Sequence, residues 1–214
     1  VQHLTNEQEF MGYSFYVNEK VLIPRQDTET LVLEASHVIK DNDRILDMCT
    51  GSGCVLLSLM KHSKDKKNIK GISGTAVDVS PDALEVTRIN ATRVEENIEI
   101  IQSDLFEKVD GKYDIIVSNP PYIKSDEIDT LEDEVRLYDP RIALDGSEDG
   151  LEFYRKIVDD AGKYLNPGGF LMVEVGSDQA RKVDLIMKDE GFENIYIRRD
   201  MSGLDRVVCA TIGK

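Results

Sequence analysis

Apolar runs with the length of β-strands alternate along this chain with longer segments that have the periodicity of helices. Such alternation indicates an α/β fold, in which a doubly wound and mostly parallel sheet carries helices on both faces. The runs predicted as strands are RILDM (44–48), GTAVDV (74–79), IEIIQ (98–102), YDIIVS (113–118), FLMVEV (170–175), NIYIRR (194–199) and DRVVCATI (205–212).

The two ends of this pattern refine the topology. Only DMSGL joins the last two strands, which is too short for a parallel crossover, so the final strand is expected to run antiparallel to its neighbour. A parallel sheet with such an end is typical of Rossmann-like methyltransferases rather than of dehydrogenases. At the front, residues 9–24 alternate around a glycine and predict a short β-hairpin. We therefore divide the chain into a linker and hairpin, 1–26, and one large domain, 27–214.

Helices are predicted between the strands from their periodicity and their end signals. Ser80 as N-cap and Pro81 at the first helical position begin one helix. Asn-Pro-Gly-Gly at 166–169 is expected to end another. The lysine-rich segment 61–71 is predicted to be an exposed loop. The expected helices are 27–40, with Asp27 or Thr28 as N-cap, 54–62, 81–96, 151–165 and 178–190.

Composition narrows the class of protein. The chain has 214 residues, of which 41% are apolar and 31% charged, and this suits one globular domain. No apolar run approaches the ~18 residues of a membrane-spanning helix, so we expect no membrane partner. Three cysteines without a CxxC pair predict a reducing, cytoplasmic location, and three scattered histidines predict no metal site. We expect a monomer.

Acidity limits the partners. The net charge is −15, which argues against direct binding to the phosphate backbone of a nucleic acid. Residues 124–160 contain 13 acidic and 5 basic residues. A solvated surface is the default interpretation of such a stretch.

A glycine-containing turn after the run 44–48 predicts a cofactor loop. Glycines allow close backbone approach, and the following helix points its first N–H groups at a ligand. The third glycine of a dinucleotide fingerprint is absent because Leu56 stands there, and a strand ending in an acid suits a cationic cofactor better than a pyrophosphate. A plain tight turn is the alternative. The predicted cofactor contacts are Asp47, Cys49, Thr50, Gly51, Ser52 and Gly53.

Two further acids follow the next two predicted strands. Asp78, 27 positions after Gly51 and followed by Val79, is placed to accept hydrogen bonds from ribose hydroxyls; the alternative is an acid that only begins the next helix. Asp104 is placed to bond an exocyclic amino group, with Leu105 covering an adenine face. The alternative there is an ordinary polar turn.

The most specific signal is Asn119-Pro120-Pro121-Tyr122, at the end of the run 113–118. Two prolines fix the backbone and remove two donors, which leaves carbonyl groups and the Asn amide to accept hydrogen bonds from an NH2 group. The flat face of Tyr122 is suited to stacking. These features favour an acceptor that is a planar amide or an aryl amine. A structural Pro-Pro turn is the alternative.

With these motifs, the chain resembles the HemK/PrmC family of S-adenosylmethionine-dependent protein-(glutamine) methyltransferases, which modify peptide-chain release factors. The resemblance extends from about residue 9 to residue 208. NPPY alone is shared with amino-methyltransferases of DNA and RNA, whereas VLIPR, YDPRIAL and DRVV are typical of the release-factor branch. The segments that carry the resemblance are EF-x-G (9–12), VLIPR (21–25), DMCTGSG (47–53), VDVSPDAL (77–84), NPPYI (119–123), YDPRIALDG (138–146), DGLEFYRKI (149–157), LNPGG (165–169), VEVG-x-x-Q (173–179) and D-x-x-G-x-DRVV (200–208).

The resemblance implies a class I methyltransferase fold and roles for the motif residues. Cys49 to Gly53 would hold the methionine part of the cofactor, Asp78 its ribose, and Asp104 with Leu105 its adenine. The remaining roles fall on the NPPY motif and on two neighbours of the glutamine pocket. Asn119 beside the sulfonium and the Pro120 carbonyl would accept from the substrate NH2, Pro121 and Tyr122 would shape the pocket, and Phe10 and Arg25 would adjoin it.

The chain departs from the family pattern at a few positions. Cys49 stands where the family has the first glycine of its loop, PRQDT (24–28) stands for PRPET, and YDPR (138–141) for YEPR. Members usually carry a small helical N-terminal domain, and this sequence begins near its junction. The acidic stretch then has a second interpretation, as a border of the acceptor mouth that steers a basic release factor by charge.

Three alternatives remain open at this stage. A nucleic-acid amino-methyltransferase would use the same NPPY site but should show a basic channel and stacking aromatics. A non-catalytic, cofactor-binding subunit would have no need of the acceptor pocket. A nicotinamide dehydrogenase is the least favoured because the third glycine is missing.

Overall fold

The structure, a computed structural model, describes residues 5–213. The strands are β1 (Glu7–Phe10), β2 (Tyr13–Tyr16), β3 (Arg44–Met48), β4 (Ser73–Asp78), β5 (Glu99–Gln102), β6 (Tyr113–Ser118), β7 (Leu165–Glu174), β8 (Glu193–Arg199) and β9 (Asp205–Thr211). The α-helices are α2 (Glu29–Val38), α3 (Cys54–Lys67), α4 (Pro81–Arg93), α5 (Asp133–Tyr138), α6 (Glu152–Tyr164) and α7 (Ala180–Asp189). Single 3-10 turns are η1 (Gln26–Thr28), η2 (Ile128–Thr130) and η3 (Arg141–Ala143).

Seven of these strands form one sheet in the order β5-β4-β3-β6-β7-β9-β8. Neighbouring strands run parallel except at β9, which is antiparallel to both β7 and β8. The prediction of a mostly parallel seven-stranded sheet with an antiparallel last strand is therefore confirmed. The five-residue connection before β9 forces this geometry because it cannot cross the sheet.

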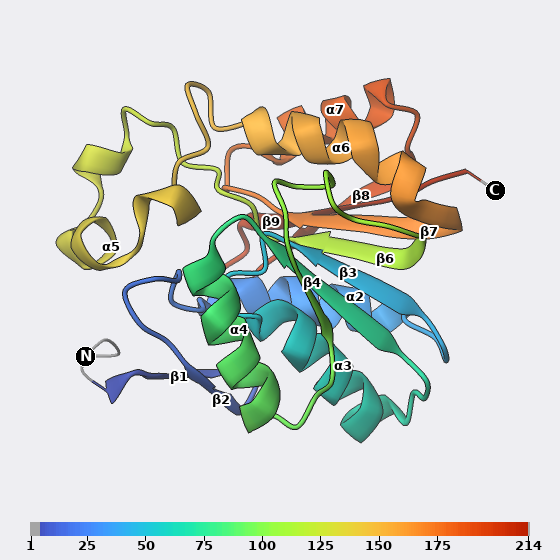
Figure 1. Ribbon diagram of the computed structural model, residues 1–214. Coiled ribbons are helices and arrows are strands. Elements are labelled where there is room, and N and C mark those ends of the chain that lie inside the picture. The colour runs from blue at the N-terminus through green and yellow to red at the C-terminus, as the bar shows by residue number, and fades with distance from the viewer. Residues whose placement is uncertain (1–4, 214) are drawn as a thin grey trace.

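Side chains along each central strand alternate between two apolar layers. On β3, Ile45 packs with residues of α2 and α3, whereas Leu46 packs with residues of α6 and α7. On β9, Val207 and Val208 divide in the same way. Figure 1 shows α6 and α7 above the sheet and α2, α3 and α4 below it. The central strands are buried on both faces, which explains why they appear in the sequence as continuous apolar runs.

The chain reverses direction across the sheet between β3 and β6. It leaves β3 for β4 and β5 on one side and then returns to β6, which pairs with β3 on the other side. The loops that follow β3 and β6 therefore diverge at the same edge. Ligands of open α/β sheets bind at such a switch point.

The predicted N-terminal hairpin is present but shorter than expected. β1 and β2 pair as a separate two-stranded sheet around the turn Met11-Gly12, and residues 17–24 form no strand. Asn90 of α4 holds the hairpin, since it accepts from the Tyr16 N–H at 2.7 Å and donates to the Tyr16 carbonyl at 2.9 Å. The division of the chain at residues 26 and 27 stays a prediction.

One local prediction was wrong and two were incomplete. Helix α3 continues to Lys67, so most of the lysine-rich segment is helical; lysine is a good helix former, and Lys64 reaches the buried Glu96 carboxylate. Helix α6 ends at Tyr164, just before Asn-Pro-Gly-Gly as predicted, but strand β7 begins at Leu165 rather than at residue 170, because Leu165 pairs with Tyr113 and the two glycines bond to the residues that follow β9. Thr28 is the N-cap residue of α2, as predicted, but its side chain makes no capping hydrogen bond. None of the described helices is long and apolar enough to cross a membrane.

Candidate active site

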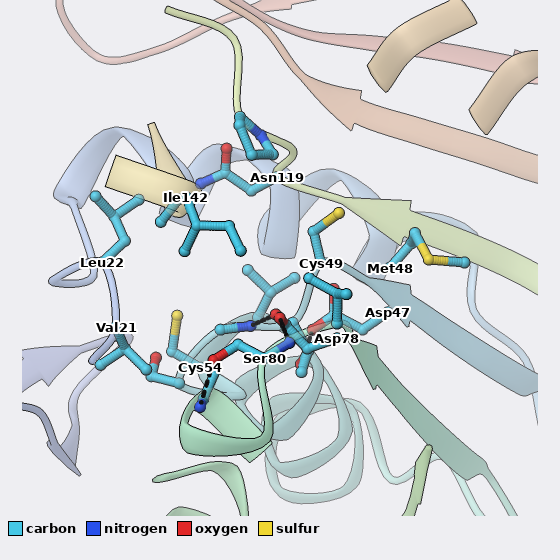
Figure 2. A pocket seen from close by; sticks show the side chains of 18 of the residues that line it. Val21, Leu22, Asp47, Met48, Cys49, Cys54, Asp78, Ser80, Asn119 and Ile142 are labelled. Carbon is cyan, nitrogen blue, oxygen red and sulfur yellow. Dashed lines mark hydrogen bonds between the residues drawn. The ribbon is translucent and has the colours of Figure 1, made fainter. Parts of the chain in front are cut away.

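A cleft opens at the carboxyl ends of β3, β4 and β6, at the switch point of the sheet. Figure 2 shows Asn119 on one side of it and Asp78 with Ser80 on the other, while Leu22 and Ile142 lie near Asn119. Predicted site residues that line the cleft are Asp47, Cys49, Thr50, Gly51, Ser52, Asp78, Val79, Asp104, Leu105, Asn119 and Pro121.

The loop after β3 wraps one side of the cleft with a left-handed backbone. Cys49, Gly51 and Gly53 have φ angles of 62°, 57° and 79°. A Cβ at Gly53 would meet Thr87 Cγ2 at 3.0 Å, so both sterics and φ require glycine there. Cys49 stands where the family has a glycine, and a glycine adopts a positive φ without steric cost. A residue with a Cβ atom is strained in this conformation, but Cys49 still lines the cleft.

Asp78 fastens this loop to β4. Its two carboxylate oxygens accept from the backbone N–H groups of Gly51 and Ser80, each at 2.9 Å. Burial raises the pKa of Asp78, and the Ser80 and Gly51 hydrogen bonds oppose that rise. The carboxylate thus shapes the loop and also faces the cleft, where its remaining lone pairs can accept from hydroxyl groups.

Asp47 places a second carboxyl at the base of the same loop. It is buried, and Oδ2 accepts from the Thr50 hydroxyl at 2.7 Å. Burial raises the pKa of Asp47 to about 7, while the Thr50 hydroxyl and the Leu56 N–H act in the opposite direction. A cation bound beside it would favour the ionised form.

Helix α4 supports the loop from behind. The Thr87 hydroxyl donates to the Gly51 carbonyl and the Asn90 amide donates to the Ser52 carbonyl, both at 2.9 Å. Because Asn90 also holds the hairpin, one side chain connects the N-terminal segment to the loop that follows β3.

Asn119 projects from the loop that follows β6. The preceding Ser118 hydroxyl donates to the Met48 carbonyl at 2.6 Å, which ties this loop to the end of β3. The Asn119 amide Nδ2 lies 3.5 Å from Thr28 Oγ1. The sequence predicted Thr28 only as a possible helix N-cap and not as a site residue, although Thr28 lines the cleft.

Three predicted residues lie outside the lining of the cleft. Gly53 is covered by Thr87, and Pro120 is buried. The Tyr122 hydroxyl turns inward and donates to Glu174 Oε1 at 3.4 Å, while the Tyr122 carbonyl accepts from Gln179 Nε2 at 2.9 Å. Of the two suggested neighbours of the pocket, Arg25 lines the cleft, whereas Phe10 is buried against Phe15 in the core.

Several lining residues come from segments far away in the sequence. The Arg25 guanidinium is 2.6 Å from the Asp139 carboxylate, which also accepts from the Ile23 N–H, so the two segments VLIPR and YDPR meet above the cleft. In the sequence, only the resemblance of these two segments to motifs of the family indicated that they belong to the site. Lining residues that sequence reasoning did not assign to the site are Lys20, Val21, Leu22, Pro24, Thr28, Met48, Cys54, Val55, Ser80, Ala83, Ser103, Ile142, Ala143 and Phe153.

Among residues 5–213, no group of three or more His, Cys, Asp or Glu side chains is arranged to hold a metal ion. His3, which was part of the argument against a metal site, lies outside the described residues.

Comparisons with known proteins decide the family. The family model of the methyltransferase small domain matches residues 25–135. A release factor glutamine methyltransferase of Clostridium acetobutylicum is 44% identical over the whole chain, which spans 75% of that relative, and one of Geobacter sulfurreducens is 42% identical over 100% of the chain and 73% of the relative. The chain belongs to the release factor glutamine methyltransferase family.

Solved structures of this family and of other methyltransferases agree in fold. The release factor-specific protein-(glutamine-N5) methyltransferase of Alicyclobacillus acidocaldarius is 29% identical with a TM-score of 0.53, over 94% of this chain and all of that one. A methyltransferase of Pyrococcus furiosus gives a TM-score of 0.67 at 18% identity, over 94% of this chain and 89% of that one, which shows the shared fold alone. The family membership does not favour the nucleic-acid alternative.

Proposed function

We propose that this enzyme transfers a methyl group from S-adenosylmethionine to the side-chain amide nitrogen of a glutamine in a peptide-chain release factor. The observation that carries the proposal is that Asn119 of the NPPY motif faces the same cleft as Asp47 and Asp78 of the cofactor loops. An acceptor site and a methyl-donor site must share one cleft for direct transfer. The family membership supplies the class of acceptor.

The donor set of the cleft fits the cofactor. The buried Asp47 and the loop Cys49–Gly53 would hold its methionine part, where an ionised carboxylate stabilises an ammonium group. Asp78 would accept from the ribose hydroxyls, with Val79 beside it. Asp104 and Leu105 would bind the adenine amino group and face. When bound, S-adenosylmethionine supplies an electrophilic methyl group on a sulfonium and leaves as S-adenosylhomocysteine.

The acceptor side of the cleft has to overcome the poor nucleophilicity of an amide nitrogen. Its lone pair is delocalised into the carbonyl, so the enzyme must favour a pyramidal nitrogen. Asn119 Oδ1 and the Pro120 carbonyl would accept the two N–H hydrogens and hold the nitrogen in line with the methyl–sulfur bond. Positioning and local dipoles then carry the catalysis, and the proton leaves to solvent after transfer. Pro121 and Tyr122 would fix the path of this loop.

The acidic segment borders the acceptor side and is proposed to steer the protein substrate. Ile142 and Ala143 of η3 line the cleft, so the segment 124–160 reaches its mouth. Opposite charge on a release factor would raise the association rate at low salt. Reversing the charges of Asp126, Glu127 and Asp129 should lower kcat/KM and flatten its salt dependence. An unchanged salt dependence would remove the steering role.

The function is tested by transfer of labelled methyl groups from S-adenosylmethionine. The acceptors are a purified release factor, the same factor with its loop glutamine replaced by alanine, duplex DNA and single-stranded RNA. We expect label only on the factor with the intact glutamine. Label on a nucleic acid would replace the proposal by the amino-methyltransferase alternative. Equal labelling of both factors would show that the glutamine is not the acceptor.

A further inference from the structure

A buried carboxyl group lies behind the loop that carries Asn119. Glu174, the last residue of β7, is 2% exposed. Its Oε1 accepts from the Tyr122 hydroxyl at 3.4 Å, but its Oε2 has no hydrogen-bond partner among the described residues. Leaving an acceptor of a buried carboxyl unpaired is costly, so the position of Glu174 calls for a functional explanation.

Thr28 stands between this carboxyl and the proposed acceptor site. Its side chain is buried, its Oγ1 accepts from Asn119 Nδ2 at 3.5 Å, and its hydroxyl opposes the rise that burial causes in the pKa of Glu174. A hydroxyl has one hydrogen to donate and an oxygen that accepts. At any one time, the Thr28 hydroxyl can therefore donate to only one of Asn119 and Glu174.

The charge on Glu174 decides that direction. An ionised carboxylate accepts and cannot donate, so the Thr28 hydroxyl would donate its hydrogen to Glu174 while it accepts from the Asn119 NH2. With its nitrogen held by Thr28, the Asn119 amide turns Oδ1 away from Thr28 and toward the acceptor. The two ends of an Asn amide have almost the same shape, and only the hydrogen-bond network distinguishes them.

We propose that Glu174 is a positioning residue that acts through Thr28 to orient the Asn119 amide with its oxygen toward the methyl acceptor. This inference rests on the proposed function, because only an NH2 acceptor needs the oxygen of Asn119. Glu174 itself does not touch the reacting atoms. Its effect is on the fraction of enzyme in which Asn119 is correctly turned.

The protonation of Glu174 then controls turnover near neutral pH. Burial raises the pKa of Glu174 to about 7; the Thr28 hydroxyl, the Arg206 guanidinium and Tyr122 lower it, and Asp27 raises it. Once protonated, Glu174 is able to donate to Thr28, which can then donate to Asn119 and turn its amide around. We expect kcat at saturating cofactor to fall as the pH decreases through about 7.

The charged groups around Glu174 come from every element packed against it. Arg206 of β9 is itself held by the buried Asp200, with Nε 3.0 Å and one NH2 2.9 Å from its Oδ2, and lies 3.5 Å from Asp27. From α6, the Tyr154 hydroxyl donates to the Glu174 backbone carbonyl at 2.9 Å. Asp200 and Arg206 form a pair and stay charged across this range, since the pKa of Asp200 is lowered and that of Arg206 raised. The pKa of Asp47 is also about 7, but Asp47 is assigned to cofactor binding, so kcat at saturating cofactor is expected to follow the titration of Glu174.

The first test compares pH profiles of kcat for the wild type, Glu174→Gln and a matched control, Glu34→Gln. Glu34 is also a buried glutamate bonded to a tyrosine and an arginine, with the Tyr196 hydroxyl and the Arg198 Nε each at 3.0 Å, but it does not line the cleft. Glu174→Gln should lower kcat about tenfold or more at pH 8 and abolish the limb near pH 7, the scale of losing a supporting residue. Glu34→Gln should keep the wild-type profile.

The second test asks whether Thr28 transmits the effect. Thr28→Val removes the hydroxyl at nearly constant volume and should lower kcat about as much as Glu174→Gln, whereas Thr28→Ser should lose clearly less. The kcat of the double variant Thr28→Val/Glu174→Gln should lie within about threefold of the kcat of either single variant, because both substitutions interrupt the same series of hydrogen bonds. The affinity for S-adenosylhomocysteine should stay within about threefold in Glu174→Gln.

A readout independent of turnover separates this inference from the proposed function. The side-chain amide resonances of Asn119 in an NMR titration should shift with a midpoint near pH 7 in the wild type and stay constant in Glu174→Gln. If the wild type methylates no release factor, the proposed function fails, and this titration alone decides the inference. A wild-type pH profile in Glu174→Gln, multiplicative losses in the double variant, or an Asn119 amide that does not titrate would each overturn it.

Discussion

Gly146 lies against the backbone of the loop that carries the acceptor motif. A Cβ at this position would lie 2.7 Å from Tyr122 Cα and 2.8 Å from its carbonyl carbon. Nonbonded carbon atoms pack at about 3.5–4.0 Å, so alanine would displace the Tyr122 backbone by about 1 Å. The two segments cannot simply separate, because the Gly146 N–H donates to the Ile123 carbonyl at 2.7 Å and the Ile123 N–H donates to the Leu144 carbonyl at 3.0 Å.

Such a displacement should be transmitted to Asn119, three residues before Tyr122. A shift of about 1 Å in a reacting group costs about 10²-fold in rate. We therefore expect Gly146→Ala to lower kcat about 10²-fold, measured under single-turnover conditions with a release factor. The affinity for S-adenosylhomocysteine, measured by calorimetry, should stay within about threefold because the cofactor loops belong to other segments.

Gly162→Ala is the matched control. Gly162 lies inside α6, where a Cβ would meet only Ile212 Cδ1 at an ordinary 3.4 Å. Alanine is favoured over glycine in a helix by about 1 kcal/mol, so this variant should melt at the same or a higher temperature and keep its kcat. A wild-type kcat in Gly146→Ala, or an equal loss in both variants, would refute the argument from steric displacement.

Three further predictions follow from the carboxyl groups. Because the pKa of Glu174 is raised from 4.5 to about 7 in the folded state, the wild-type free energy of unfolding should fall as the pH rises between those values, by up to about 3 kcal/mol. Urea denaturation of Glu174→Gln should lack this contribution, whereas Asp47 lowers the stability of both proteins alike, so that the variant gains relative to the wild type from pH 5 to pH 8, and parallel curves would contradict the assignment. Asp78→Asn removes one of the acceptors for Gly51 and Ser80 and should weaken S-adenosylhomocysteine binding about 10- to 100-fold in calorimetry; an unchanged affinity would exclude Asp78 from the cofactor site. The affinity for S-adenosylmethionine should rise between pH 6 and pH 8 as Asp47, whose pKa is about 7, becomes ionised, and a flat profile that matches Asp47→Asn would exclude this role.

The sequence predicted the centre of the sheet well because the central strands are buried on both faces. The run 113–118 coincides with β6, and the N-cap Ser80 with Pro81 begins α4, where the Ser80 hydroxyl accepts from the Ala83 N–H. Local signals of this kind depend on only a few neighbouring residues, so they keep the same effect in the folded protein. The end of α6 was predicted to within one residue, but the start of β7 was predicted five residues too late, since the pairing of Leu165 with Tyr113 extends the sheet through the turn residues that follow α6.

The site was predictable only as far as its motifs extend. Asp47, Asp78 and Asn119 follow strands directly, so the topology brings them to one edge of the sheet. Thr28 looked like a helix cap, because nothing nearby in the sequence reveals a partner 91 positions away. Glu174 looked like an ordinary strand residue for the same reason. Only the fold brings its buried carboxyl group next to Tyr122 of the NPPY motif.

The most direct measurement for the whole account is the effect of Asn119→Ala on methyl transfer and on cofactor binding together. The account assigns Asn119 to the acceptor, so turnover on a release factor should fall about 10²-fold or more, the scale of losing one aligned polar group. Binding of S-adenosylhomocysteine should stay within about tenfold. Normal turnover in Asn119→Ala would contradict the account, because the NPPY loop would then not hold the methyl acceptor.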